Sequence, residues 1–593
     1  MKYPELYINP VYRQPSGSLF NFGGDNIETM KAGIDKIIDR LECNVIRFNA
    51  GSNSTLVNLS KLLDYVKQKE KEGEIDIVTY KDFYEKNAIR INDLIKDKHT
   101  YYVAMDGNSR VGLSQNEPMN FERLLTKQYM TGDKILFKRG DIFYGQIYTN
   151  LITVDNNVLT LSSYGDTKKG KPIISCYKIV NKKESWEKES DKIYRIDLTD
   201  RSKFQGIKDI TYEGATIGFM ETKNKTKYYN LKKTLSELTE LYDYYYNERY
   251  LFVRTNGATP YEELGELKLA TGISILVMCS NIKIENLHLQ GTGQHGMRGN
   301  RIEIENVEIV NNIVEDIGGI FNSGKDLYGN GIDFYQIDVK NVKIHKNIVR
   351  NTYDVAFRIQ GVQGSGTNIS LTKNMFCLNS QDSEIWEAEK ATGIYNYNFE
   401  DNISFLVGRG WGNLARPDKY CTSHILFWAY GFDNVEEKTK IYFNHNYIYN
   451  PKRIYFIAEY LDTHILFQKD KCIRSDFNHY YLNNDSFIYW DRFNFSRKNN
   501  FIEDFNKDKN SEFILLDKED PILVDKITNS LDYNELRKIF VNDEKGKNHS
   551  NALLISIIVI IIIALLLFGG FFIFRYIKTK KDDFSLNKLM KLL

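Results

Sequence analysis

Few features of this 593-residue chain point to a metal cofactor or to a nucleic-acid partner. Its six cysteines are scattered, and no two have CxxC or metal-ligand spacing, so we expect most of them to be small buried apolar side chains. Lys and Arg number 79 and Asp and Glu number 78, for a formal net charge of +1. This balance gives no electrostatic basis for binding nucleic acid. The first residues also contain no apolar run of the kind found in secretory signals.

A repeated pattern runs through residues 281–390. Short alternating runs such as Ile282-Lys283-Ile284 and Ile302-Glu303-Ile304 recur, and each is followed by an Asn, a turn and another short strand. Alternation at period two predicts strands, and repetition at roughly 20–30 residues predicts a solenoid of stacked coils. A leucine-rich repeat would show a Leu frame that is missing here, and the strands of a β-sandwich need not share a template. The pattern therefore predicts an all-β fold, a right-handed parallel β-helix.

The recurrent asparagines predict an internal ladder, in which stacked amides pass hydrogen bonds from coil to coil. The asparagines expected to take part are Asn286, Asn306, Asn347, Asn374, Asn402 and Asn446.

Aligning the coils predicts a column of charged residues on one face. Arg298, Asp333, Arg358 and Glu384 fall into one register, next to His295, Tyr335, Gln360 and Trp386. We interpret this column as a charged groove and as the candidate site. The alternative is a salt-bridged ladder that neutralises itself and only stabilises the stack.

The most specific signal lies near the C-terminus. Residues 552–574 are uncharged and apolar, long enough to cross a bilayer, and Arg575, Lys578, Lys580 and Lys581 follow at once. The positive-inside rule predicts a single-pass protein with a cytoplasmic basic tail at 575–593 and an extracellular large domain. The absence of a signal in the first residues leaves two readings open. Either the gene model lacks its beginning, or the protein is tail-anchored with a cytoplasmic domain.

Residues 1–95 alternate helix-like and strand-like runs, among them ETMKAGIDKIIDRL and NVIRFNAG. This order resembles the C-terminal end of polysaccharide deacetylases. The family's strand equivalent to residues 45–49 carries a metal-site or catalytic His, whereas this chain has Asn49 there and no His before His99. The resemblance therefore implies a truncated α/β remnant without deacetylase activity.

Residues 100–500 resemble the pectate lyase-like superfamily of β-helix proteins. Residues 100–180 carry YYVAMDGNSR, TGDKILFKRGD and SSYGDTKKGKPIIS, which are similar to the family's N-terminal cap, and the repeats carry GTGQHGMRG, YGNGIDFYQ, NTYDVAFRIQG, SEIWE and GWGNLARPD. In similar proteins residues 181–280 would extend the early coils. The resemblance implies a protein that handles polysaccharide, and Trp411, between two glycines, would suit sugar stacking or a packed corner.

Two reactions fit the column. A glycoside hydrolase needs two carboxylates, for which Asp333 and Glu384 are the natural pair, although Arg358 between them is expected to lower both pKa values. A lyase would bind a uronate carboxylate through Arg298 or Arg358 and use His295 or Tyr335 as base or acid. No cofactor is predicted, except that similar lyases use Ca²⁺. Asp316, Asp326 and Asp354 are the candidate calcium ligands only if the insertion between coils folds back.

We therefore predict six segments. They are a deacetylase-like remnant (1–95), a cap with the first coils (96–280), the β-helix repeats (281–500), a charged and partly helical tether (501–551), a transmembrane helix (552–574) and a cytoplasmic tail (575–593). The predicted function is cleavage of a polysaccharide at the membrane by a hydrolase or lyase. The alternatives are a non-catalytic surface protein that binds glycan, of the adhesin type, and a decayed enzyme.

Overall fold

The computed structural model describes residues 98–540 apart from short gaps, together with residue 31 and most of 61–72. The gaps are residues 126–128, 150, 153–156, 207–216, 300–302, 323–325, 336–337, 362–365, 389–393, 417–421, 431–438, 458–471, 485, 492–496, 499–506, 518–519 and 531. Residue 31 and the described part of 61–71 are helical.

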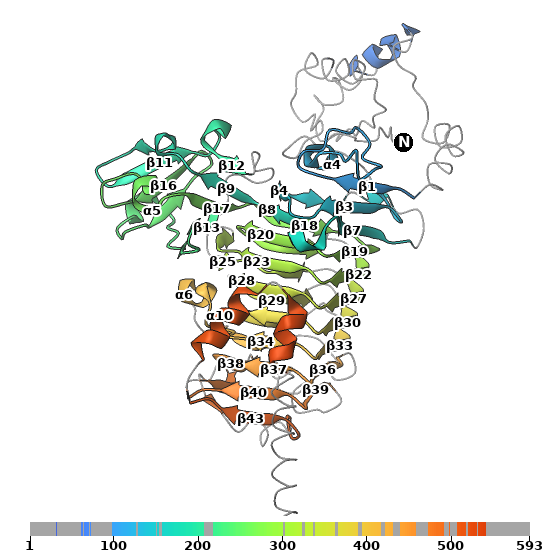
Figure 1. Cartoon of the computed structure of the whole chain (residues 1–593), viewed down its shortest axis with the longest axis vertical. Helices are drawn as coiled ribbons and strands as arrows, with labels where there is room; N and C mark the ends of the chain where they lie inside the picture. Colours follow the sequence, from blue (N-terminus) through green and yellow to red (C-terminus); the bar gives the residue numbers. More distant parts are fainter. Residues whose placement is uncertain are drawn as a thin grey trace, which may run out of the picture. The chain divides into compact units, whose positions relative to one another are not determined.

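Three long sheets form the faces of a parallel β-helix, which confirms the predicted architecture (Figure 1). Each coil gives one strand to each sheet, and within a sheet the neighbouring strands run parallel. Sheet 1 consists of β1 (Thr100–Val103), β3 (Lys134–Lys138), β7 (Leu159–Tyr164), β19 (Ile282–Glu285), β22 (Ile304–Val310), β27 (Val339–His345), β30 (Gly366–Thr372), β33 (Ile394–Glu400), β36 (Ile441–Asn444) and β39 (Ile473–Asp476).

The other two sheets complete each coil. Sheet 2 consists of β4 (Ile142–Tyr144), β8 (Ile173–Ser175), β20 (His288–Thr292), β23 (Ile313–Ile317), β28 (Ile348–Thr352), β31 (Met375–Cys377), β34 (Ile403–Phe405), β37 (Tyr447–Tyr449), β40 (His479–Leu482) and β43 (Glu512–Leu515). Sheet 3 consists of β5 (Ile147–Tyr148), β18 (Ser274–Met278), β21 (His295–Gly299), β26 (Ile332–Tyr335), β29 (Val355–Gly361), β32 (Gln381–Ala388), β35 (Ser423–Tyr430), β38 (Arg453–Ile457), β41 (Phe487–Asp491) and the antiparallel β42 (Arg497–Lys498).

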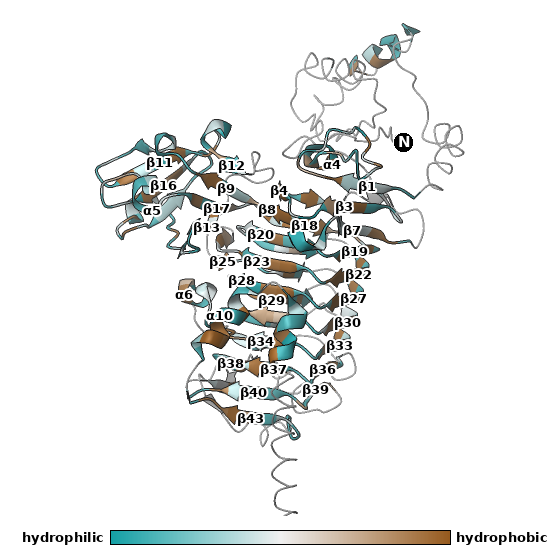
Figure 2. Ribbon diagram, viewed as in Figure 1, coloured by the Kyte–Doolittle hydropathy of each residue, from teal (hydrophilic) through white to brown (hydrophobic). Residues whose placement is uncertain are grey.

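The alternation of the strands sorts apolar side chains into the interior. Strand β19 alternates buried Ile282 and Ile284 with partly exposed Lys283 and Glu285. One continuous apolar core, from Tyr101 to Tyr480, fills the stack. Figure 2 shows hydrophobic and hydrophilic positions interspersed along the strands. Because β43 pairs with β40, the stack continues past the predicted end at residue 500.

An asparagine ladder runs inside the stack, as predicted, but its members differ in part. The backbone N–H of Asn347 donates to Asn374 Oδ1 at 3.0 Å, and the same step repeats along the coils. The ladder is formed by Asn312, Asn347, Asn374, Asn402, Asn446 and Asn478. Asn286 and Asn306 belong instead to outer ladders at turns, where they adopt positive φ angles of 60° and 56°. Asn tolerates this conformation better than most residues, which explains its recurrence there.

Residues 177–271 do not extend the early coils, in contrast to the prediction. They form two mainly antiparallel sheets with a core of their own around Trp186, Tyr244 and Val253. The first contains β10 (Glu187–Lys188), β11 (Ile193–Asp197), β15 (Tyr244–Tyr246) and β16 (Tyr250–Arg254). The second contains β9 (Tyr177–Val180), β12 (Gln205–Gly206), β13 (Ile217–Thr222), β14 (Lys227–Tyr228) and β17 (Leu267–Thr271). We call this segment the antiparallel insertion.

The remaining elements are short. Two further strand pairs are β2 (Tyr129–Met130) with β6 (Leu151–Ile152), and β24 (Ile320–Asn322) with β25 (Asp326–Tyr328). Between residues 98 and 530 the described helices are α4 (Phe121–Leu125), α5 (Pro260–Leu264), α6 (Trp411–Ala415) and α10 (Pro521–Asn529), with 3₁₀ turns η1 (Thr167–Lys169), η2 (Lys183–Ser185), η3 (Arg201–Lys203) and η4 (Leu235–Glu237). Helix α5 begins with a capping box between Thr259 and Glu262.

Residues 1–531 form one compact unit and residues 532–593 a second, in which residues 533–540 are helical. Within the described residues, no helix is long and apolar enough to span a bilayer. The predicted transmembrane helix at 552–574 and nearly all of the deacetylase-like segment lie outside the described residues.

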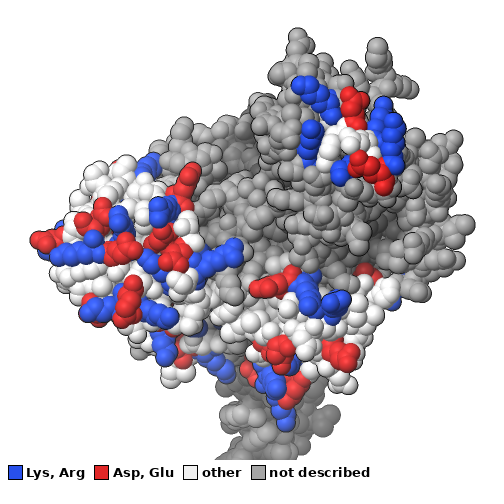
Figure 3. All heavy atoms as spheres, turned by 90° about the horizontal axis from the view of Figure 1, so that it is seen from above, with Lys and Arg blue, Asp and Glu red and all other residues white. Residues whose placement is uncertain are grey.

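Most of the described cysteines are buried and the surface charges are mixed, as the sequence predicts. Cys176, Cys377 and Cys472 are buried free thiols, and Cys279 is half-buried. In the view of Figure 3, basic and acidic side chains are interspersed over the described atoms, as expected for a net charge near zero.

Candidate active site

The four charged residues of the predicted column lie on consecutive rungs of sheet 3. Arg298 pairs with Asp333, Asp333 with Arg358, and Arg358 with Glu384 in the strand register. Neighbouring side chains on these strands, such as Met297, Ile332, Phe357 and Ile385, belong to the apolar core or pack in the interior. The column therefore lies on the outer face of sheet 3.

Asp333 is the most tightly held member of the column. Its Oδ1 accepts hydrogen bonds from Arg358 Nε at 2.5 Å and from Asn330 Nδ2 at 3.0 Å, and its side chain is buried. Burial alone would raise the pKa of this carboxyl, but Arg358 and the other donors hold the pKa below its usual value. Asp333 is therefore a carboxylate at neutral pH.

His295 lies against the same carboxylate. Its Nε2 is 3.7 Å from Asp333 Oδ2, and its Nδ1 accepts a hydrogen bond from the Asn330 backbone N–H at 3.3 Å. With Nδ1 as acceptor, the ring proton resides on Nε2 and faces Asp333. Burial lowers the pKa of His295 to about 4 despite the attraction of Asp333, so the ring is neutral at pH 7.

Arg358 connects the column to a partly exposed edge. Its Nη1 donates to Gln360 Oε1 at 3.0 Å, and its guanidinium lies 5.0 Å from the ring centroid of Tyr335. Tyr335 is 42% exposed, whereas Gln360 is buried. Tyr335 therefore offers an aromatic surface to solvent beside the charged column.

Glu384 differs from Asp333 in its surroundings. Its side chain is buried, and among the described residues this side chain forms no hydrogen bond or ion pair. Burial raises its pKa to about 7, and the nearby carboxylates Asp354 and Asp333 add to this effect against the opposing charges of Arg358 and Arg416. Arg358 does lower the pKa of Glu384, as expected, but the net shift is upward because desolvation outweighs the neighbouring cation.

Asp354 and Arg416 complete the charge environment, although neither was predicted to belong to the column. Asp354 directly precedes β29, and its Oδ1 accepts hydrogen bonds from Arg416 Nη1 and from Gln381 Nε2, the latter at 3.1 Å. Arg416 also lies over the ring of Tyr353, 5.7 Å from its centroid. The Arg-Pro turn in GWGNLARPD was the sequence signal for this residue, but sequence spacing could not show that it returns to β29.

The two predicted tryptophans take different positions. Trp386 pairs in register with Gln360 and Trp428 on sheet 3 and is partly exposed. Trp411 is buried on α6, where it packs against Phe219 and Tyr353 and donates from Nε1 to the Asn351 carbonyl at 3.0 Å. The geometry favours the packed-corner interpretation of Trp411 over sugar stacking at the column.

Of the three candidate calcium ligands, Asp316 and Asp354 each pair with a cationic side chain, and the side chain of Asp326 lies outside the described part of the structure. Asp316 is paired with Lys227 at 2.7 Å, and Asp354 is paired with Arg416. In the described part of the chain, no group of three or more His, Cys, Asp or Glu side chains is placed to hold a metal ion. Both Asp316 and Asp354 thus use their charge to bind a cationic side chain.

No protein-family model and no curated protein sequence matches this chain. Solved structures with similarity to it include a GH136 lacto-N-biosidase from Eubacterium ramulus, at 11% identity and TM-score 0.30, covering 78% of this chain and 75% of that chain. XylC in complex with xylose matches at 11% identity and TM-score 0.34, covering 71% and 86%. Pectate lyase Pel9A matches at 12% identity and TM-score 0.27, covering 71% and 77%.

At these identities and TM-scores, the function of this chain has to be argued from its own residues. The comparisons lend no support to the deacetylase resemblance of residues 1–95.

Proposed function

We propose that this chain is a carbohydrate-active β-helix enzyme that hydrolyses a polysaccharide at the column on sheet 3. The observation that carries the proposal is the placement of two carboxyls two rungs apart on one face, with Arg358 between them, in surroundings that shift their pKa values in opposite directions. Asp333 is held ionised by Arg358, and the pKa of Glu384 is raised to about 7. Two carboxyls with pKa values driven apart by their environments are suited to separate roles as base and acid.

In the proposed reaction, Glu384 donates its proton to the glycosidic oxygen as the bond to the anomeric carbon breaks. Asp333 takes a proton from a water molecule, and the resulting hydroxide forms the new bond to that carbon from the opposite face. Arg358 lies on the rung between them, where it stabilises the carboxylate that forms on Glu384. His295 and Asn330 hold Asp333 in place from the other side.

The separation of the two carboxyls favours inversion of configuration. Asp333 and Glu384 stand two rungs apart, which corresponds to about 10 Å between their backbones. Inverting enzymes leave room for a water molecule between the carboxyls, whereas retaining enzymes hold them at about 5 Å.

A polysaccharide lyase is the second candidate. Arg298 and Arg358 lie on the two rungs that flank Asp333, and both are partly exposed. In these positions they could bind a uronate carboxylate. The neutral His295 would then be the nearest base, and Ca²⁺ remains the cofactor expected for such chemistry. A surface protein that binds glycan without cleaving it is the third.

One panel assay separates these functions. The full-length chain is incubated with neutral and uronate-containing polysaccharides while reducing ends and the ultraviolet absorbance of an unsaturated product are followed together. Hydrolysis releases reducing ends without unsaturation, and elimination produces both. Binding without either signal would favour the non-catalytic protein.

We further propose that the enzyme is a single-pass membrane protein anchored by residues 552–574, with the large domain outside the cell. The apolar run and the basic residues after it support this placement. Protease treatment of intact cells should degrade the β-helix and spare the C-terminal tail. Protection of the β-helix would contradict the proposed orientation.

A further inference from the structure

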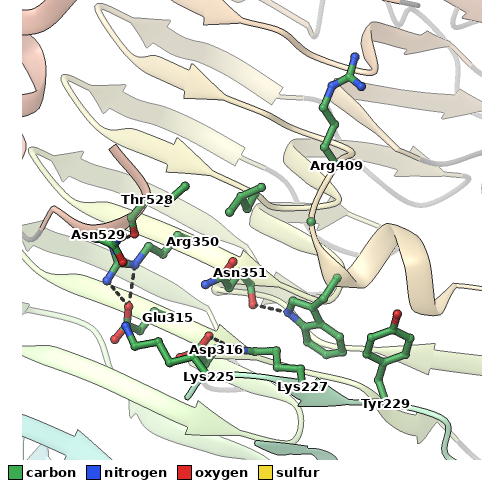
Figure 4. Close-up of a pocket in the computed structure, with 13 residues that line it drawn as sticks. Lys225, Lys227, Tyr229, Glu315, Asp316, Arg350, Asn351, Arg409, Thr528 and Asn529 are labelled. Carbon is green, nitrogen blue, oxygen red and sulfur yellow. Dashed lines mark hydrogen bonds and ion pairs between the residues drawn. The ribbon is translucent and has the colours of Figure 1, made fainter. Parts of the chain in front are cut away.

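A cavity of about 390 Å³ lies where sheet 2 meets the antiparallel insertion (Figure 4), whereas the column lies on sheet 3. It is lined by residues of β23 and β28, of the hairpin formed by β13 and β14, of the start of α6 and of the end of α10. A volume of this size lies within the range of small-ligand sites. The proposed reaction makes no use of this cavity.

The cavity carries an excess of positive charge. Four basic side chains and two acidic side chains line it, namely Lys225, Lys227, Arg350, Arg409, Glu315 and Asp316. Both acidic groups already bind cations: Arg350 lies 2.5 Å from Glu315, and Lys227 lies 2.7 Å from Asp316. Arg350 is itself 3% exposed, so this polar wall is built into the fold.

Lys225 supplies a positive charge at the edge of this cavity. It lies in the turn between β13 and β14, is exposed, and forms no ion pair with any described residue. Its backbone has a positive φ of 62°, so the turn has a defined shape there. An anionic group entering the cavity would meet this ammonium group without having to break an existing ion pair.

The opposite side of the cavity is aromatic. Tyr229 and Trp411 line it with ring centroids 6.0 Å apart. Asn351, Thr528 and Asn529 add uncharged polar groups to the lining. Aromatic surface combined with hydrogen-bonding side chains suits the two kinds of surface on a sugar ring.

Helix α6 joins this cavity to the column. Its first residue, Trp411, lines the cavity, and Arg416, which directly follows the helix, binds Asp354 beside Glu384. The helix has five residues, so Trp411 and Arg416 are about 7.5 Å apart along its axis. A polysaccharide long enough to cover both could be held in the cavity while it is cleaved at the column.

We propose that the cavity binds an anionic sugar unit, one that carries a carboxylate or a sulfate ester, at a distance from the bond that is cleaved. Lys225 binds the anionic group, and the Tyr229–Trp411 side receives the ring. The choice of a sugar as ligand rests on the proposed function, whereas the preference for an anion rests on the cavity itself.

Calorimetric titration of the full-length chain with small sugars tests the proposal. The chain carries the Glu384→Gln substitution, which prevents cleavage during the measurement. The probes are digalacturonate, a sulfated galactose disaccharide, the neutral galactose disaccharide and inorganic sulfate. We expect an anionic disaccharide to bind at least about tenfold more tightly than the neutral one, as a charge-assisted contact would give. The better of the two anionic probes identifies the group.

Matched charge reversals locate the binding. Lys225→Glu should weaken binding of the anionic disaccharide by about tenfold or more, from loss of the charged contact. Lys223→Glu alters the net charge equally on the same hairpin outside the cavity and should leave binding unchanged. Equal binding of charged and neutral disaccharides, no binding, equal effects of both variants, or equally tight binding of sulfate alone would each overturn the proposal.

The binding test of the cavity can be decided whether or not the column hydrolyses polysaccharide. If anionic disaccharides bind and Lys225→Glu abolishes binding while the wild-type chain cleaves no polysaccharide, the proposed function fails and the cavity stands as a binding site. If the chain hydrolyses polysaccharide but Lys225→Glu has no effect on binding, the cavity proposal fails alone.

Discussion

Arg358 Nε lies 2.5 Å from Asp333 Oδ1 on the adjacent rung, and both side chains are largely buried. Removing either partner leaves a buried charge without its counter-ion, which typically costs about 3–5 kcal/mol. We therefore expect Asp333→Asn and Arg358→Met each to lower the free energy of unfolding by roughly this amount. The double variant should lose clearly less than the two single losses together.

Urea unfolding of the four proteins measures this coupling. Additive losses would show that the pair is not coupled in solution. The exposed pair Lys343–Glu308 on sheet 1 is the control, and breaking it should cost about 1 kcal/mol or less.

The raised pKa of Glu384 predicts how activity and stability depend on pH. Activity should fall as pH rises through about 7, because the acid loses its proton, while Asp333 stays ionised down to below 3.8. The pH profile of kcat/KM measures this limb. An infrared carboxyl band, present in the wild type at pH 6 and absent from Glu384→Gln, would report the proton directly.

The same shift has a consequence for stability. The folded pKa of Glu384 exceeds its ordinary value of 4.5, so its stabilising contribution is complete below that value and is lost as pH rises through about 7. Above pH 7 we expect Glu384→Gln to be more stable than the wild type by roughly 1–3 kcal/mol. If the column served only to stabilise the stack, Glu384→Gln would be less stable than the wild type above pH 7. Glu308→Gln on the outer face of sheet 1 is the matched control.

Arg416 should act as a positioning residue for Glu384. It neutralises Asp354, whose negative charge raises the pKa of Glu384. Arg416→Gln should therefore move the alkaline limb of the pH profile to higher pH, and Asp354→Asn should move it to lower pH. Loss of activity in both variants without any movement of the limb would indicate that this pair has only a structural role.

The interior asparagine ladder should contribute more to stability than the outer ladders. Asn347 is fully buried, accepts from Asn312 N at 2.8 Å and donates to the Ile309 carbonyl at 2.8 Å. Asn347→Ala leaves buried backbone groups unpaired and should cost roughly 2–4 kcal/mol in thermal or urea unfolding. Asn341→Gly, on an exposed ladder at φ 54°, should cost less than about 1 kcal/mol. Equal losses of stability in the two variants would contradict a larger contribution from the interior ladder.

The sequence predicted the coil architecture and the register of the column because both follow from period-two alternation, which repeats along the chain. Arg298, Asp333, Arg358 and Glu384 align as predicted because a slip of one residue would place core side chains such as Phe357 outside. The antiparallel insertion escaped prediction because runs such as β13 and β16, which are buried along most of their length, can be recognised as strands but do not reveal how they pair. Alternation alone does not tell parallel from antiparallel pairing.

The electrostatics of the site could not be predicted, because they depend on burial and on residues distant in sequence. Arg416 reaches Asp354 across 62 positions, and desolvation of Glu384 outweighs the lowering of its pKa by Arg358. Trp411 was a candidate for sugar stacking at the column from its place between two glycines, but its ring packs against Phe219 of the insertion and Tyr353, and its remaining surface lines the cavity on sheet 2.

The most direct test of the proposed reaction is the stereochemistry of the first product, followed by proton NMR on a polysaccharide from which the wild type releases reducing ends. The account predicts an inverted anomeric configuration at the new reducing end. It also predicts a loss of turnover of at least about 10²-fold in Glu384→Gln, with substrate binding retained. Retention of configuration, an unsaturated product, or full turnover in Glu384→Gln would contradict the assignment of Glu384 and Asp333 as acid and base.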